Sequence, residues 1–181
     1  MKSFKWTMVL AFVAAGCAAQ AQDTDTASKP DDTGVKRLNS MAELKTSAGA
    51  DAGSAAATDM GDYVLIRVDA KGLPAGVKGV HVHTTGRCDA PKFESAGAHW
   101  NPTTKQHGSE NPAGPHAGDL PNLEVMADGT ATIQFKLSSG TYAGLMEGDG
   151  SALVIHANAD DLKTDPSGNS GGRIACGVFK S

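Results

Sequence analysis

Short runs of hydrophobic and β-branched residues alternate with glycine-rich turns along the chain after residue 38. Residues 63–69, for example, interrupt their hydrophobic positions with Arg67 and Asp69, a pattern typical of a half-buried β-strand. No segment shows ten or more residues of clean helical periodicity. Strands are predicted at residues 40–46, 53–59, 63–69, 79–84, 120–126, 130–137, 151–157 and 173–179. The Asp128-Gly129 corner predicts a hairpin between two of them. This pattern predicts an all-β fold, an eight-stranded Greek-key β-barrel or sandwich.

The first 16 residues have the pattern of an export signal. Two lysines precede an apolar run over residues 6–15, which is shorter than the roughly 20 residues that span a bilayer. Small residues then lead to Cys17, as in the lipobox of bacterial lipoproteins. Residues 1–16 are therefore predicted to be a lipoprotein-type signal peptide, and Cys17 the lipid anchor. Cleavage after Ala21, at a small-x-small site, is the alternative and would give a soluble periplasmic protein.

Residues 17–38 are mostly small and polar. They cannot bury enough apolar surface to offset the entropy lost on ordering, so they are predicted to be a flexible tether before a domain over residues 39–181. Removing Lys2 and Lys5 with the signal changes the formal net charge from −4 to −6. Such an acidic chain is not expected to bind nucleic acid.

Residues 89–119 form a long stretch without a strand pattern and contain four of the eight prolines. A loop of this length within a compact domain needs something that holds it. Its candidate ligands are His99, His107, His116 and Asp119. Three imidazoles and one carboxylate suit a tetrahedral zinc ion. The alternative is that polar residues collect in an exposed loop that binds nothing.

The other three histidines lie in predicted strands. His81 and His83 are two residues apart, which places both imidazoles on one face of a strand. His156 ends another strand and can complete that face. Such His-x-His pairs are common in exposed strands, but ligation by imidazoles alone favours copper(II). The two sets together use all six histidines of the chain.

Several short motifs follow one another in the order seen in a known family. They are GVHVH at 79–83, GRC at 86–88, AHWNP at 98–102, GPHAGDL at 114–120, LVIHANADD at 153–161 and GGRIACG at 171–177. With His107, they resemble copper,zinc superoxide dismutase of the bacterial secreted kind, over about residues 40–181. The resemblance implies a barrel with a long metal-binding loop and a long electrostatic loop.

The resemblance also implies one copper and one zinc ion per chain. The implied copper ligands are His81, His83, His99 and His156. The implied zinc ligands are His99, His107, His116 and Asp119, so that the His99 ring is shared as an imidazolate. Asp160 is implied to connect His81 to His107. Arg173 is implied to receive an anionic substrate, and Cys88 and Cys176 to form a disulfide, which suits an oxidising compartment.

The implied activity is superoxide dismutation, in which two superoxide anions and two protons give O2 and H2O2. Copper would cycle between Cu(II) and Cu(I), and His99 would take up and release a proton. Because the chain is acidic, attraction of the anion must be local, at the metal centre and Arg173. Lys163, in the loop after Asp160, is a candidate for an extra guide, and the alternative is that it is an ordinary solvated lysine. The location implied is the bacterial periplasm, with lipid anchoring to a membrane, and a homodimer is compatible with the family. A non-enzymatic copper- and zinc-binding module of the same fold is the alternative.

Overall fold

The computed structural model describes residues 37–180. Its strands are β1 (Asn39–Thr46), β2 (Asp51–Asp59), β3 (Val64–Ala70), β4 (Gly76–Lys78), β5 (Val80–His83), β6 (Leu123–Val125), β7 (Ala131–Lys136), β8 (Ala152–His156) and β9 (Arg173–Val178). The helical elements are one turn of 3-10 helix, η1 (Glu94–Ala96), and α1 (Tyr142–Leu145). Between residues 37 and 180, no helix has the length and apolar character needed to cross a bilayer. The predicted signal peptide, Cys17 and most of the predicted tether lie outside the described residues.

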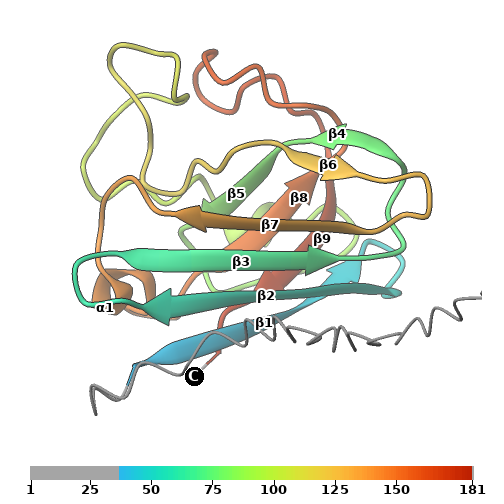
Figure 1. Ribbon diagram of the computed structural model, residues 1–181, viewed down its shortest axis with the longest axis horizontal. Helices are drawn as coiled ribbons and strands as arrows, with labels where there is room; N and C mark the ends of the chain where they lie inside the picture. Colours follow the sequence, from blue (N-terminus) through green and yellow to red (C-terminus); the bar gives the residue numbers. More distant parts are fainter. Residues whose placement is uncertain (1–36, 181) are drawn as a thin grey trace, which may run out of the picture. The chain divides into compact units, whose positions relative to one another are not determined.

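One antiparallel sheet contains seven strands in the order β5-β8-β9-β1-β2-β3-β7, and β4 pairs with β6 in a separate ribbon. Figure 1 shows the large sheet curled, with the β4–β6 ribbon near its two end strands, β5 and β7. The first three strands form a meander, whereas β6, β8 and β9 are each reached by a long connection. The observed architecture is the Greek-key β-barrel that the strand pattern predicted.

The eight predicted strands are present, but two details of the prediction were wrong. The short strand β4 was missed, because three residues cannot show an alternating pattern. The predicted hairpin has its turn, where the Met126 amide donates to the Thr130 carbonyl at 2.9 Å. However, β6 pairs with β4 and β7 pairs with β3. An Asp-Gly corner fixes only the local reversal of the chain and does not decide which strands pair beyond it.

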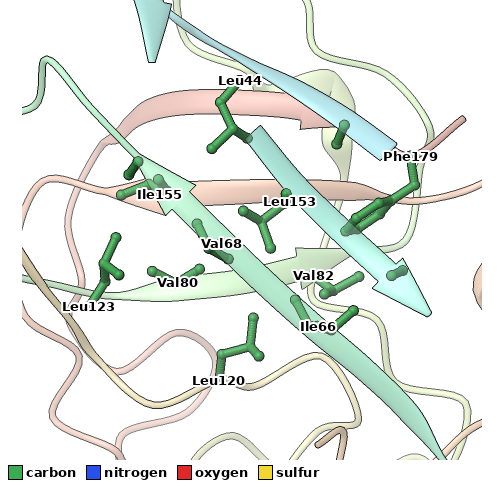
Figure 2. Close-up of a cluster of buried hydrophobic side chains, with 14 of the residues drawn as sticks. Leu44, Ile66, Val68, Val80, Val82, Leu120, Leu123, Leu153, Ile155 and Phe179 are labelled. Atoms are coloured by element: carbon green, nitrogen blue, oxygen red, sulfur yellow. The ribbon is translucent and has the colours of Figure 1, made fainter. Parts of the chain in front are cut away.

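The core fills the inside of the barrel with aliphatic side chains (Figure 2). β5 contributes Val80 and Val82, which lie beside Leu153 and Ile155 of β8. Complete burial of each such side chain stabilises the fold by about 1.5–3 kcal/mol. Because side chains of a strand alternate between its faces, the two histidines of β5 face away from this core. They are nevertheless fully buried, so other parts of the chain must cover them.

The two histidines of β5 are covered by residues 89–119, the long stretch in which no strand was predicted. The Trp100 amide donates to the Val82 carbonyl at 2.8 Å, and the Val82 amide donates to the Gly118 carbonyl at 2.8 Å. Both partners come from residues 89–119, which therefore extend the edge of β5 through isolated bridges. A Cβ at Gly118 would lie 2.3 Å from the Val82 carbonyl oxygen, so only glycine allows this approach.

A second loop, residues 157–172, lies against the first one. Figure 1 shows both loops projecting from the same side of the barrel. They are joined where the Glu110 amide donates to the Leu162 carbonyl at 2.9 Å. The outer face of β5 and the end of β8 are thereby covered by the two loops, and the buried histidines lie beneath them.

Candidate metal centre

The four imidazoles expected to bind copper converge in the structure. His81 and His83 come from β5, His156 from the end of β8, and His99 from the first long loop. Their ligand atoms lie within 4.8 Å of one another, and all four residues are more than nine-tenths buried. The backbone bridge between His83 and His99 places the loop residue beside the strand residue.

Backbone carbonyls fix the tautomers of two of these rings. His83 Nδ1 donates to the Gly97 carbonyl at 2.9 Å, and His156 Nδ1 donates to the Gly171 carbonyl at 3.1 Å. Because a carbonyl oxygen can only accept, both rings must carry their proton on Nδ1 and a lone pair on Nε2. Both Nε2 atoms are buried and have no hydrogen-bond partner within residues 37–180.

His81 is held in the opposite tautomer. Its Nε2 donates to Asp160 Oδ2 at 2.6 Å, and its Nδ1 is buried without a partner among the described residues. Three unpaired lone pairs thus meet in one buried space, which is costly unless a cation accepts them. Burial also lowers the pKa of His81 to about 3, of His83 to about 2 and of His156 to about 4, so the rings stay neutral and able to bind a metal. The donor set therefore fits copper.

The zinc set meets at one oxygen of Asp119. Oδ1 lies 2.9 Å from His99 Nδ1, 3.1 Å from His107 Nδ1 and 3.2 Å from His116 Nδ1. The Nδ1 atoms of His99 and His116 are 3.4 Å apart. A tetrahedron with metal–ligand bonds of 2.0–2.1 Å has edges of about 3.3 Å, so the four atoms stand at the spacing of zinc ligands.

The ligand atoms of His81, His99, His107 and Asp119 also lie within 4.8 Å of one another, with His81 in the place of His116. The shorter contacts favour His116, because its Nδ1 is 3.2 Å from Asp119 Oδ1. His81 has its Nε2 on Asp160, and its free Nδ1 belongs with the copper group. The predicted zinc set is thus assembled, and His99 is common to both clusters.

The carboxylates at the zinc cluster favour a bound cation. Burial alone would raise the pKa of Asp119, but hydrogen bonds from His107, His99 and the Gly108 amide outweigh it and hold that pKa well below its usual range. Burial alone would likewise lower the pKa of His107. Its hydrogen bonds to Asp119 and Asp160 outweigh that effect and raise the pKa to about 9. Two carboxylates therefore stabilise positive charge at this position.

Asp160 connects the two clusters in the geometry expected from the sequence. Its Oδ2 accepts from His81 Nε2 at 2.6 Å, and its Oδ1 accepts from His107 Nε2 at 3.0 Å. Asn122 holds the Asp160 backbone through both of its amide atoms, each at 2.8 Å. A Cβ at Gly168 would lie 1.8 Å from Asp160 Oδ1, so a glycine is needed behind the carboxylate. Neither Asn122 nor Gly168 was predicted.

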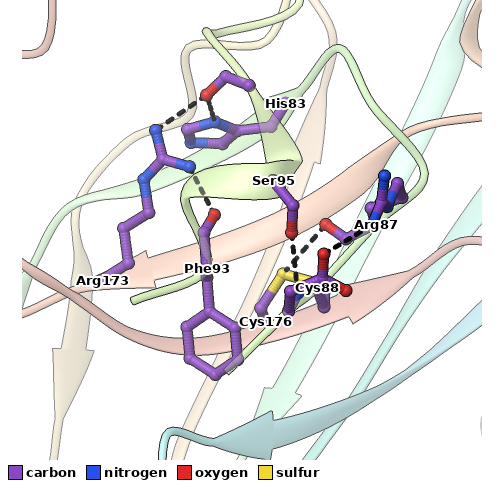
Figure 3. Close-up of a disulfide and its surroundings, with 9 residues drawn as sticks. His83, Arg87, Cys88, Phe93, Ser95, Arg173 and Cys176 are labelled. Atoms are coloured by element: carbon purple, nitrogen blue, oxygen red, sulfur yellow. Dashed lines mark hydrogen bonds and ion pairs between the residues drawn. A yellow bond between two sulfur atoms is a disulfide. The ribbon is translucent and has the colours of Figure 1, made fainter. Parts of the chain in front are cut away.

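Arg173 lies at the copper side, half-buried, with its guanidinium on two carbonyls (Figure 3). Its Nη1 donates to Phe93 at 2.6 Å and its Nη2 donates to Gly97 at 2.7 Å. The Gly97 carbonyl is the same one that accepts from His83. One backbone oxygen therefore positions a candidate copper ligand and the candidate anion-binding cation together. These carbonyls were also not predicted, since no side-chain pattern marks them.

The implied disulfide between Cys88 and Cys176 is present, with Cα atoms 5.7 Å apart (Figure 3). It ties the segment before Phe93 and Gly97 to β9, the strand that carries Arg173. Lys163 is exposed, and its side chain has no hydrogen bond or ion pair to any residue from 37 to 180. Its expected part in attracting substrate stays a prediction.

The fold and the site define an antiparallel β-barrel metalloprotein with two adjoining ligand clusters. A sequence model of the family described as copper/zinc superoxide dismutase (SODC) matches residues 51–179. The chain belongs to this family.

Three relatives show how close the similarity is. The chain is 41% identical over 152 residues to "Superoxide dismutase [Cu-Zn] 1" of Aquifex aeolicus, covering 81% of this chain and 90% of that one. It is 48% identical over 120 residues to "Superoxide dismutase-like protein YojM" of Bacillus subtilis, covering 63% and 61%. The crystal structure of a SOD-like protein from Bacillus subtilis matches with a TM-score of 0.71 at 41% identity, covering 76% and 96%.

Proposed function

We propose that this chain is a superoxide dismutase that converts two superoxide anions and two protons into O2 and H2O2. The proposed copper ligands are His81, His83, His99 and His156. The proposed zinc ligands are His99, His107, His116 and Asp119. The observation that carries the proposal is the position of His99, whose ring stands in both clusters.

When bound, copper supplies reversible one-electron chemistry, and zinc supplies charge without redox change. The chain's own residues transfer the proton, attract the anion and orient the imidazole rings. With His99 Nδ1 at the zinc cluster, Nε2 is the nitrogen that can hold a proton on the copper side and release it to reduced substrate. Arg173 presents a positive charge that its two carbonyl partners hold in place. Asp160 and the Gly97 and Gly171 carbonyls keep the neighbouring rings in the tautomers that leave lone pairs free.

Removal of superoxide by protein loaded with one copper and one zinc per chain tests the proposal. Catalytic removal with both metals present, and none in the metal-free protein, would support it. Retention of both metals without turnover would instead identify the alternative, a non-enzymatic metal-binding module of this fold.

Arg173→Ala should lower kcat/KM for superoxide by about 10- to 100-fold while leaving both metals bound, because the variant loses a local cation that attracts the anion. Arg87→Ala is the matched control, since Arg87 is exposed and pairs with Asp89 at 2.6 Å. Fast kinetics and elemental analysis of both variants provide the measurement. Equal rates for Arg173→Ala and the wild type would contradict the assigned role.

A location in the bacterial cell envelope is supported by the disulfide, which forms and persists in oxidising compartments. We extend the proposal to lipid attachment at Cys17. Intact-mass analysis of the protein from a native-type host should give a chain that begins with a lipidated Cys17. An unmodified chain that begins at Gln22 would contradict the anchor and favour the soluble alternative. A homodimer stays a prediction.

A further inference from the structure

The three imidazoles at the zinc cluster each use Nδ1 toward Asp119, so each has Nε2 on its far side. For His107, Nε2 meets Asp160 Oδ1 at 3.0 Å. For His99, the far side belongs to the copper group. His116 Nε2 is the remaining case, and it forms no hydrogen bond with any residue from 37 to 180. Metal-binding histidines almost always give their second N–H to a carboxylate, a carbonyl or a water.

Asp165 is the carboxylate that faces this nitrogen. Its Oδ1 lies 3.9 Å from His116 Nε2, and the same oxygen accepts the His107 backbone amide at 2.6 Å. The His116 side chain is 9% exposed and that of Asp165 is 49% exposed, so Asp165 lies between the buried zinc ligand and solvent. A shift of about 1 Å brings the carboxylate into hydrogen-bond distance.

The position of Asp165 is set by contacts between the two long loops. The Leu162 carbonyl accepts from the Glu110 amide at 2.9 Å, and the Lys163 carbonyl accepts from the Asn111 side chain at 3.3 Å. Within its own loop, Asp161 caps the turn by accepting the Lys163 and Thr164 amides at 3.0 and 2.8 Å. These hydrogen bonds fix the conformation of the loop, and the loop places Asp165 beside the zinc ligands.

We infer that Asp165 is a positioning residue for the zinc cluster, a second supporting carboxylate that acts on His116 as Asp160 acts on His107. The Asp165 oxygen that already accepts the His107 backbone amide also accepts the far nitrogen of His116 once the carboxylate has moved by about 1 Å, and it thereby slows the loss of zinc. This inference rests on the zinc ligands proposed above. It assigns to the loop at residues 157–172 a part in retaining zinc, separate from any part in attracting substrate.

The rate at which full-length protein loaded with copper and zinc transfers zinc to a colorimetric chelator tests the inference. Asp165→Ala should release zinc about 10- to 100-fold faster than the wild type, within the range seen when partners of metal-bound histidines are removed. Asp165→Asn, which keeps an acceptor oxygen but loses the charge, should fall between them. With cobalt(II) at the zinc cluster, Asp165→Ala should also change the visible spectrum, which reports ligand geometry directly.

Asp161→Asn is the matched control, because it removes a carboxylate charge from the same loop but keeps the Oδ1 atom that accepts the Lys163 and Thr164 amides, and within residues 37–180 Asp161 contacts no histidine. It should keep the wild-type cobalt spectrum and release zinc within about 2-fold of the wild-type rate. Wild-type release by Asp165→Ala, or equal effects of both substitutions, would overturn the role of Asp165 and leave the zinc ligands intact. Failure of the wild type to hold zinc would overturn the ligand assignment together with this inference.

Discussion

Asp119→Ala should abolish stable zinc binding and remove the thermal stabilisation that zinc provides. The substitution deletes the oxygen that lies 2.9–3.2 Å from three histidine nitrogens. It also deletes Oδ2, which accepts the Gly108 amide at 2.9 Å and the His116 amide at 3.0 Å. The metal-binding loop therefore loses its zinc and two internal hydrogen bonds in one step.

The size of the effect follows from linkage between binding and folding. Zinc at a free concentration 1,000 times its Kd stabilises the folded chain by about 4 kcal/mol. In a domain of this size that corresponds to roughly 10 °C in Tm. Calorimetry with zinc and with a chelator should show this difference in the wild type and not in Asp119→Ala.

The control for this experiment is Asp128→Ala, which removes an exposed carboxylate that accepts the Thr130 amide in a turn. That variant should keep the full response to zinc. A zinc-induced rise in Tm in Asp119→Ala equal to that of the wild type would show that the carboxylate is not a ligand.

Removing the disulfide should have the other large effect. Cys88 and Cys176 are 88 residues apart, and closing a loop of that length restricts the unfolded chain by about 4–5 kcal/mol in the chain-entropy description. The double variant Cys88→Ser/Cys176→Ser should therefore lose about 4 kcal/mol of unfolding free energy, measured by urea denaturation of the metal-free protein.

The reduced wild-type protein is the natural comparison, because it lacks the bond but keeps both sulfur atoms. It should unfold at nearly the same urea concentration as the double variant. Without the disulfide, the segment that follows Cys88 stays partly attached to the barrel, because the Phe93 side chain is buried against Ala152, Val154 and Cys176. A loss below about 1 kcal/mol in the double variant would show that packing of this segment, and not the covalent bond, holds it in place.

Much of the metal centre could be predicted from the sequence because its side chains have few other uses. The spacing of His81 and His83 alone places both on one face of a strand. The long loop has no strand pattern that would order it, and it contains four residues of types that bind zinc: His99, His107, His116 and Asp119. The family motifs then added Asp160 and Arg173. In the structure all of these lie around the two clusters.

The supporting contacts could not be predicted, for a physical reason. Gly97 and Gly171 act through backbone carbonyls, which every residue has, so only the path of the chain reveals them. Asp165 has the chemistry of a supporting carboxylate, but any aspartate in an exposed loop has it too. The missed strand β4 and the wrong partner for β6 have a similar origin, because pairing between distant short segments depends on closure of the barrel.

The carbonyl of Gly97 has a consequence for how this protein can vary. The segment from Cys88 to Gly97 is pinned at one end by sulfur and at the other by an oxygen that serves both His83 and Arg173. In this chain, an insertion between Cys88 and Gly97 is expected to displace that oxygen from both partners at once, whereas substitution of the exposed side chains leaves both contacts in place. Libraries built on this scaffold should therefore diversify the solvent-facing positions of the segment and keep its residue count constant.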